Sequence, residues 1–261
     1  MEKIATRREK ILASLKDGNV LSIGALSEAH KVSAMTIRRD LEFLAEQGAV
    51  QFYRGGAVIN PQFFEEDPHP DNYYLQQQAM LHKEEKTLIA KEAAALPLPQ
   101  ETVMLDSGTT IYYLARELPG SRNLTLISWS LNVIEELIRQ SRHKILVQGG
   151  IYHPETRMFE NNQGLDIIKN SRASRAFISA GGFHMNLGIT TPFHYEIETK
   201  RAAIKYSMTS ILLIDSFKFD KVCSAYMADL SDFQAVITDS GIPPEYRDFI
   251  LSAGIELIIA A

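Results

Sequence analysis

From about residue 80 onward, short apolar runs alternate with stretches of helical periodicity. The apolar runs include TVMLD at 102–106 and LTLIS at 124–128, and they continue as KILVQGG, RAFISAGG, SILLID, AVITD and IELIIA. Helical stretches lie between them, as in LNVIEELIRQ at 131–140. Strands joined through helices need crossover connections, which make the strands parallel and cover both faces of the sheet. The sequence therefore predicts an α/β domain with a mainly parallel sheet.

The first 60 residues have a different pattern. Helical spacing predicts helices over 6–16 and about 24–30, and a third helix that Ser33 caps and Gly48 ends. The segment AVQFYRGGAVI then alternates around a Gly-Gly pair, which is typical of a hairpin. Three helices and a hairpin predict a winged helix-turn-helix DNA-binding domain at 1–60. We expect a proline-rich linker at 61–78 and the α/β domain at 79–261.

Charge is distributed unevenly along the chain. The formal charge of the 261 residues is -5, but residues 1–60 hold nine Lys/Arg and seven Asp/Glu. A weakly basic head on an acidic body has the sign expected if only the head contacts phosphate. The single cysteine, Cys223, excludes an intramolecular disulfide and a multi-cysteine metal site. The charged N-terminus and the lack of a long apolar stretch predict a cytoplasmic protein with no membrane partner, and no motif indicates a cofactor.

The third predicted helix, SAMTIRRDLEFLAEQG at 33–48, has one apolar stripe. Ile37, Leu41 and Leu44 fall on one face of a helical wheel. The first two turns then expose Met35, Thr36, Arg38 and Arg39. Arginine and threonine at the leading end of such a helix can contact bases and phosphates in the major groove. The alternative is an amphipathic helix with solvated charges. The preceding helix and the following hairpin favour DNA recognition.

A turn of small residues follows the first predicted strand of the body, in MLDSGTTIYYL at 104–114. Amides at the start of a helix, with the hydroxyls of Ser107, Thr109 and Thr110, suit an anion such as phosphate. The alternative is a tight turn capped by its own hydroxyls. Neither GxxxxGK[ST] nor GxGxxG is present, which argues against a nucleotide site.

The head resembles the N-terminal domain of DeoR-type bacterial transcription regulators. The resemblance rests on VSAMTIRRDL at 32–41 and RGGA at 54–57. It implies that Ser33, Thr36, Arg38 and Arg39 face DNA and that Arg54 contacts a backbone or the minor groove. Asp40 is a poor DNA contact because of its charge. We expect it to orient an arginine or to pair with the first helix, at Arg7 or Arg8.

The body resembles the DeoR-type effector domain, which is similar in fold to ribose-5-phosphate isomerase, glucosamine-6-phosphate deaminase and the coenzyme A transferases. The matching motifs are the GTT turn at 106–110, SWSLN, QGG, SAGGFH at 179–184, EIETKRA at 196–202 and DSFKF at 215–219. The resemblance implies that Gly108, Thr109 and Thr110 hold the phosphate of a sugar phosphate. It also implies that Asp106 accepts from sugar hydroxyls and that Lys200 or Lys218 supplies positive charge. Phe217 departs from the family, which commonly has serine there.

These observations predict a repressor of carbohydrate or nucleoside catabolism genes. Its affinity for a double-stranded DNA operator would be modulated by a phosphorylated sugar, and one small head implies a homodimer or larger homo-oligomer. An alternative is a sugar-phosphate isomerase or deaminase with a DNA-binding head. SAGGFH lacks the acidic residue that such an isomerase needs, so we expect no enzymatic activity. A further alternative is a constitutive DNA-binding protein.

Overall fold

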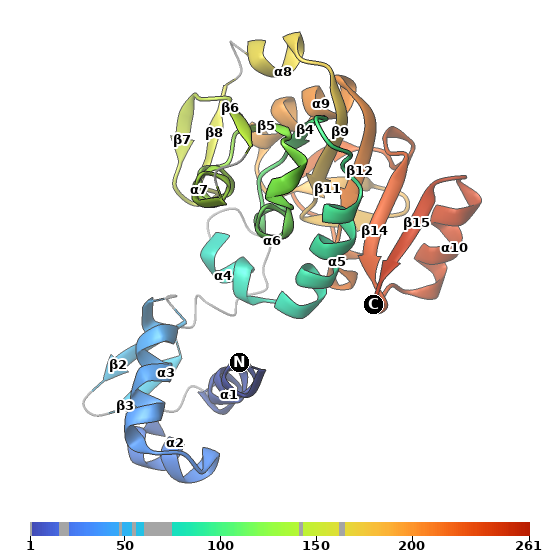
Figure 1. The fold of residues 1–261 in the computed structure, drawn as a ribbon. Coiled ribbons are helices and arrows are strands. Elements are labelled where there is room, and N and C mark those ends of the chain that lie inside the picture. The colour runs from blue at the N-terminus through green and yellow to red at the C-terminus, as the bar shows by residue number, and fades with distance from the viewer. Residues whose placement is uncertain are drawn as a thin grey trace. The chain divides into compact units, whose positions relative to one another are not determined.

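The computed structural model describes residues 2–15, 21–46, 49–53, 56–59, 75–140, 143–161 and 165–261. The chain divides into two compact units, residues 1–67 and 68–261, which Figure 1 shows as a ribbon. Among the residues with described structure, no helix is long and apolar enough to cross a membrane.

The N-terminal unit contains the predicted helices and hairpin. Its elements are α1 (Glu2–Leu15), β1 (Leu21–Ser22), α2 (Ile23–His30), α3 (Ala34–Glu46), β2 (Val50–Tyr53) and β3 (Gly56–Ile59). The strands form an antiparallel sheet in the order β1-β3-β2. This confirms the predicted hairpin and adds β1, which is two residues long and too short to give an alternating pattern. The predicted helix stop at Gly48 lies outside the described residues.

Side-chain caps and an apolar stripe fix α2 and α3. The amide of Ala25 donates to Ser22 Oγ at 3.1 Å, and the amide of Thr36 donates to Ser33 Oγ at 3.2 Å. Each hydroxyl satisfies an amide that has no acceptor within its own helix. The predicted stripe is confirmed, since its three side chains are fully buried: Ile37, Leu41 and Leu44.

Asp40 joins α3 to α1. Its carboxylate accepts from Arg7 Nε at 2.6 Å and from Arg8 Nε at 2.9 Å, and the residue is 2% exposed. The predicted pairing with the first helix is confirmed, and it involves both arginines. The guanidinium of Arg8 also lies over the ring of Phe43, 3.7 Å from its centroid. The two contacts together hold α1 against α3.

The second unit is built on a seven-stranded sheet with the strand order β15-β14-β12-β9-β4-β5-β6. Every neighbouring pair is parallel, which confirms the predicted α/β architecture. The strands are β4 (Thr102–Leu105), β5 (Thr125–Ser128), β6 (Lys144–Val147), β9 (Ala173–Ser179), β12 (Ser207–Leu213), β14 (Ala235–Asp239) and β15 (Glu256–Ala260). The helices are α4 (Leu75–Met80), α5 (Lys83–Ala95), α6 (Thr109–Glu117), α7 (Leu131–Gln140), α8 (Asp166–Asn170), α9 (Ile197–Lys205) and α10 (Pro244–Ser252).

Two smaller sheets and four 3₁₀ turns complete the described part of this unit. One sheet has the order β10-β11-β13 and the other pairs β7 with β8, all antiparallel. Their bounds are β7 (Ile151–His153), β8 (Met158–Glu160), β10 (Gly182–His184), β11 (Gly188–Thr191) and β13 (Ala225–Ala228). The turns are η3 (Gly120–Arg122), η4 (His194–Glu196), η5 (Ser216–Lys218) and η6 (Leu230–Asp232). Residues 75–78, which we assigned to the linker, form most of α4.

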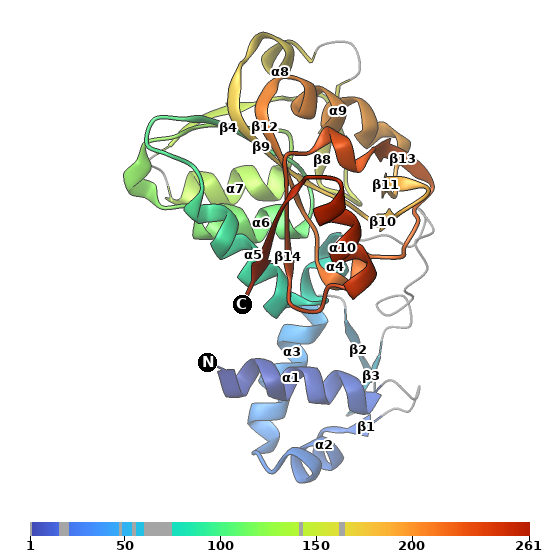
Figure 2. The same cartoon turned by 90° about the vertical axis from the view of Figure 1, so that its right-hand side faces the viewer.

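Helices cover both faces of the large sheet, with α5, α6 and α7 on one side and α8, α9 and α10 on the other (Figure 2). Strand β9 lies in the middle of the sheet and is buried on both faces. Phe177 packs into the core beneath α5–α7, whereas its neighbours Ala176 and Ile178 pack into the opposite core. A strand buried on both faces reads as a continuous apolar run, as RAFIS does.

The parallel strands bring polar residues to one edge of the sheet. Asp106 follows β4, Ser179 ends β9 and Asp215 follows β12. Because β4, β9 and β12 are adjacent and parallel, their carboxyl ends lie side by side. Ligands of open α/β sheets bind at such an edge.

Candidate functional site

A pocket lies at this edge of the sheet, with a volume of about 510 Å³ that includes the open space at its mouth. Most of the predicted ligand residues line it: Ser107, Gly108, Thr109, Thr110, Lys200 and Lys218. Asp106 is not among the lining residues, and its side chain is fully buried behind them. The fold therefore collects residues from three distant sequence motifs around one space.

The turn from β4 into α6 forms one wall of the pocket. Gly108 has a φ of 106°, which favours glycine, and a Cβ there would lie 2.5 Å from Ser179 Oγ. The helix α6 begins at Thr109 without a side-chain cap. The amides of a helix's first turn have no acceptor within the helix. They are therefore suited to hold an anion in the pocket, with the hydroxyls of Thr109 and Thr110 beside them.

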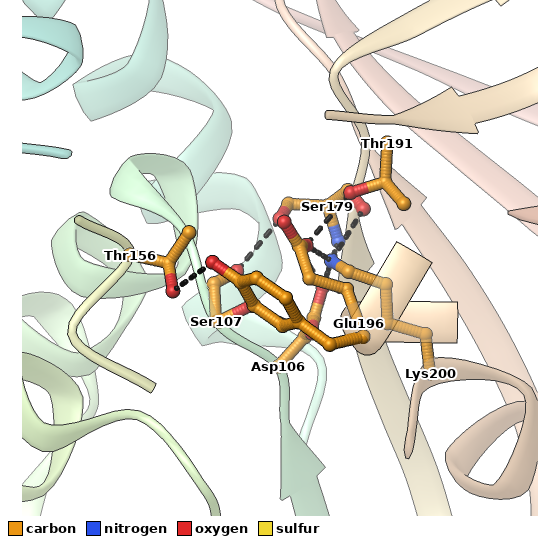
Figure 3. A network of polar contacts seen from close by, with 8 residues as sticks. Asp106, Ser107, Thr156, Ser179, Thr191, Glu196 and Lys200 are labelled. Carbon is orange, nitrogen blue, oxygen red and sulfur yellow. Dashed lines mark hydrogen bonds and ion pairs between the residues drawn. The ribbon is translucent and has the colours of Figure 1, made fainter. Parts of the chain in front are cut away.

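Lys200 is the centre of a buried polar network, which Figure 3 shows from close by. Its ammonium lies 2.5 Å from Asp106 Oδ2 and 3.3 Å from Glu196 Oε2, and it donates to the carbonyl oxygen of Ser179. The same Asp106 oxygen accepts from the amide of Ser179 at 2.9 Å and from its hydroxyl at 3.1 Å. Thr191 donates its hydroxyl to Glu196 at 2.7 Å. The network ties the ends of β4 and β9 to α9.

Burial and neighbouring charges act in opposite directions on the pKa values of Lys200 and Glu196. Burial alone would lower the pKa of Lys200, but the carboxylates of Asp106 and Glu196 together raise it. Burial raises the pKa of Glu196, although Lys200 and Thr191 oppose that rise. The charge of Lys200 is therefore already balanced inside the protein. The Asp106 carboxylate faces Lys200 and Ser179.

Lys86 is a pocket residue that the sequence analysis did not identify. It is 2% exposed, and its Nζ donates to the carbonyl oxygens of Gln78 at 2.6 Å and Leu81 at 2.7 Å. Among the described residues no carboxylate oxygen lies within 4 Å of this ammonium. Burial lowers the pKa of Lys86 to about 8, with Asp215 opposing and Lys218 reinforcing the shift. The sequence offered no signal, because KEEK at the start of a helix is typical of a solvated face.

Asp215 and Lys218 approach the pocket from the turn after β12. Asp215 is 2% exposed, and its Oδ1 accepts no hydrogen bond from the residues described. A buried acceptor without a donor is costly, so this oxygen is suited to a hydroxyl of a ligand. Lys218 forms no ion pair with a described residue. Within the described part of the chain, the pocket thus combines two cations that form no ion pair, Lys86 and Lys218, with one acceptor that lacks a donor, Asp215 Oδ1.

The predicted DNA-contacting residues of α3 lie in the N-terminal unit. Ser33, Met35, Arg38 and Arg39 are exposed, and Met35 is 60% exposed despite its apolar side chain. Thr36 is half-buried, and its hydroxyl lies 2.9 Å from Ser33 Oγ. Arg38 lies 3.4 Å from Glu42 on the same helix, a surface pair that DNA can displace. Arg54 lies outside the described residues.

Other pocket residues were present in motifs but had no assigned role. Ser179 opens the SAGGFH motif and Glu196 opens EIETKRA, and both line the pocket. Thr156 and Thr191 also line it. Figure 3 shows Thr156 on the side opposite Thr191. The hydroxyl of Thr156 lies 3.1 Å from Tyr195 Oη, which donates to Glu155.

Comparison with known proteins identifies both units. The model of the DeoR-like helix-turn-helix domain matches residues 7–63, and that of the DeoR C terminal sensor domain matches residues 81–240. The transcriptional repressor AccR of Agrobacterium fabrum is 33% identical, with 90% of this chain and 89% of the relative aligned. The deoxyribose operon repressor of Escherichia coli is 30% identical, with 97% of this chain and 99% of the relative aligned.

One solved structure that aligns is ribose 5 phosphate isomerase A from Neisseria gonorrhoeae, over 54% of each chain at 15% identity, with a TM-score of 0.39. The family assignment does not depend on this match. The relatives are named as transcriptional regulators and repressors, which favours a regulator over the isomerase-like or deaminase-like enzyme. From the two domain matches and the full-length relatives, we conclude that the chain belongs to the DeoR family of DNA-binding transcriptional regulators.

Proposed function

We propose that this regulator is a sequence-specific repressor of carbohydrate or nucleoside catabolism genes, and that a phosphorylated sugar in the pocket lowers its affinity for its operator. The observation that carries the proposal is the content of the pocket, which pairs anion-binding groups with a buried acceptor. The names of two relatives, deoxyribose operon repressor and putative aga operon transcriptional repressor, support the gene class.

The anion-binding side of the pocket fits a phosphate. The first-turn amides of α6 are aligned with the positive end of the helix dipole, and the hydroxyls of Thr109 and Thr110 add donors. Lys86 and Lys218 line the same pocket and form no ion pairs with described residues. These two ammonium groups place positive charge beside the turn at the start of α6, whereas the charge of Lys200 is taken up by Asp106 and Glu196. A dianionic phosphate ester balances that charge better than a neutral sugar does.

The opposite role, acceptance from sugar hydroxyls, fits Asp215 better than Asp106. Asp215 lines the pocket, and one of its carboxylate oxygens lacks a donor. The Asp106 oxygen that faces inward already accepts from three donors, on Ser179 and Lys200. We therefore propose that Asp106 positions Lys200 and that Asp215 contacts the sugar.

In this proposal, α3 is the helix that contacts DNA. Arg38 and Arg39 are exposed near its start, with Ser33 and Thr36 beside them. Phosphate contacts would position the helix, and one or two arginine contacts to bases would specify the site. One such helix makes few contacts, so we propose that a homodimer or larger homo-oligomer binds repeated half-sites. A ligand then acts by binding more tightly to the state that does not fit the operator.

Calorimetric titration of the purified chain tests the pocket directly. Ribose 5-phosphate, deoxyribose 5-phosphate and glucosamine 6-phosphate would be compared with the unphosphorylated sugars and with inorganic phosphate. We expect saturable binding of at least one sugar phosphate and none of the free sugars. Lys218→Met should weaken this binding at least tenfold, whereas Lys221→Met removes an exposed lysine three residues away and should not. Equal binding of phosphorylated and free sugars would contradict the proposal.

A further inference from the structure

Helix α4 is both a wall of the pocket and the first described element after the segment that follows the DNA-binding unit. Leu75 and Gln78 of α4 line the pocket, and β3 of the DNA-binding unit ends at Ile59. A change in the position of α4 would therefore act at the same time on the pocket and on the chain that leads to the DNA-binding unit. No other helix among the described residues occupies this place in the sequence.

The position of α4 depends on a few tertiary contacts. A helix of six residues is too short to be stable on its own. The amide of Leu75 donates to the carbonyl oxygen of Glu155 at 2.9 Å, and Tyr113 Oη donates to that of Ala79 at 2.9 Å. Lys86 adds the bonds to Gln78 and Leu81. Three of the four bonds thus satisfy carbonyl groups at the C-terminal end of α4, where the carbonyl oxygens of a helix have no N–H donor within the helix.

Lys86 connects this end of α4 to the pocket. Its ammonium donates to two uncharged carbonyl oxygens, and it is buried beside the same pocket that residues 107–110 line. Hydrogen bonds from an ammonium to a phosphate oxygen are shorter and stronger than those to a carbonyl group. The two bonds to α4 leave one of the three N–H groups of the ammonium for a phosphate ester in the pocket, and that stronger bond pulls the ammonium toward the ligand.

The turn after α4 has a second connection to the pocket. His82 has a φ of 52°, and its ring stacks on Phe217 with centroids 3.4 Å apart and an interplanar angle of 16°. Phe217 lies next to Lys218 in the same 3₁₀ turn, and Lys218 lines the pocket. Phe217, which stands where the family commonly has serine, therefore packs the α4–α5 turn against η5, the turn that carries Lys218.

We propose that α4 is the element that couples the pocket to the DNA-binding unit. A phosphate ester draws the Lys86 ammonium away from the carbonyl groups of Gln78 and Leu81, which weakens the packing of α4. The chain that connects α4 to the DNA-binding unit is then no longer anchored at Leu75. This inference rests on the proposed function, because it explains how that same pocket acts on the operator.

Two substitutions loosen α4 without any ligand. Lys86→Met removes both of its bonds, and Tyr113→Phe removes one bond while keeping the buried ring. Tyr112→Phe is the matched control, since Tyr112 neighbours Tyr113 on α6 and lies outside the pocket wall. Operator affinity is measured by fluorescence anisotropy without ligand, on full-length variants whose melting curves show a folded protein. Hydrogen exchange over residues 75–81 is measured on the same samples.

We expect Lys86→Met and Tyr113→Phe each to weaken operator binding by about tenfold, within the range of typical allosteric coupling, and to speed exchange at 75–81. Tyr112→Phe should do neither. Folded Tyr113→Phe protein that binds the operator like the wild type would overturn the coupling role of α4. If a sugar phosphate still releases the wild-type protein from DNA, the proposed function survives that result. If no sugar phosphate binds, the proposed function fails instead.

Discussion

Lys200 Nζ lies 2.5 Å from Asp106 Oδ2, although 94 positions separate the two residues and both are almost completely buried. The pair joins the end of β4 to α9 beneath the pocket, and Glu196 contacts the same ammonium from the other side. The pair therefore fixes the position of the turn at 106–110, between β4 and α6, from the buried side. It also makes the two carboxylates unequal, because Asp106 Oδ2 accepts from three donors at 2.5 to 3.1 Å, whereas Glu196 Oε2 accepts from Thr191 and lies 3.3 Å from the ammonium.

The first prediction concerns that inequality. Asp106→Asn should destabilise the protein by about 3 kcal/mol or more, because an amide nitrogen would replace an acceptor and leave a buried ammonium with a weaker partner. Glu196→Gln is the matched control. Burial already raises the pKa of Glu196, and a Gln oxygen can still accept from Thr191, so the expected change is within about 1 kcal/mol. Chemical denaturation measures both, and equal losses would contradict the distinction.

The second prediction separates the sugar from its phosphate. Asp215→Ala removes the carboxylate oxygen that lacks a donor, so a sugar phosphate should bind at least about tenfold more weakly. Inorganic phosphate should bind no more weakly, because the substitution removes a negative charge near Lys86 and Lys218. Calorimetry with both ligands tests this. An equal loss for both would show that Asp215 supports the pocket and does not contact the sugar.

The third prediction is a pH dependence of ligand binding. Burial holds the pKa of Lys86 at about 8, so its ammonium is mostly charged at pH 7 and mostly neutral at pH 9. A phosphate ester is a dianion over this whole range, because its second pKa is near 6. If binding requires the ammonium form, affinity should fall by about tenfold between pH 7 and pH 9. Titrations at four or five pH values measure the slope.

Lys86→Met provides the comparison for the pH series. Asp215, Lys218 and Glu85 are the charged groups that influence Lys86, and all three remain in this variant. Its residual binding should vary much less over the same range. A wild-type profile that is flat from pH 7 to pH 9 would mean that the Lys86 ammonium does not contact the ligand.

The fourth prediction assigns a role to Arg39. Arg39→Ala should weaken binding to DNA from upstream of the regulator's own gene by about tenfold or more, and random DNA much less, if Arg39 contacts a base. An equal loss on both DNAs would make it a phosphate contact. Arg116→Ala is the control, since it removes the same charge from an exposed position of the sensor unit. Anisotropy titrations at one fixed salt concentration measure all three proteins.

Much of the fold could be predicted from periodicity. The seven strands of the large sheet are apolar runs because both faces are covered, and α3 has a clean stripe because one face packs on α1 and α2. The short strands β7, β8 and β10 could not be predicted, since three residues give no pattern. Helix α4 was missed because tertiary contacts hold it rather than its own sequence.

The candidate site could be predicted where its residues lie in a single motif, or in a motif shared with the DeoR-type effector domain, as Lys200 and Lys218 do. The turn at 106–110 was identified because its small residues are contiguous. The partnership of Asp106 with Lys200 arises from the meeting of β4 and α9, which no local pattern shows. Lys86 and Asp215 were missed for the same reason. In the sequence, Lys86 is typical of a solvated helix face and Asp215 is typical of a loop after a strand. Only the fold shows that both lie at one pocket.

The measurement that tests the account most directly is an operator titration with and without a saturating sugar phosphate, on the wild type and on Thr109→Val. Thr109 lines the pocket at the start of α6, and valine preserves its shape while removing the hydroxyl. We predict that the sugar phosphate lowers wild-type operator affinity at least fivefold, the lower end of typical allosteric coupling, and that Thr109→Val binds the operator normally but loses the response. Wild-type operator affinity that stays unchanged while calorimetry shows the sugar phosphate bound would contradict the account.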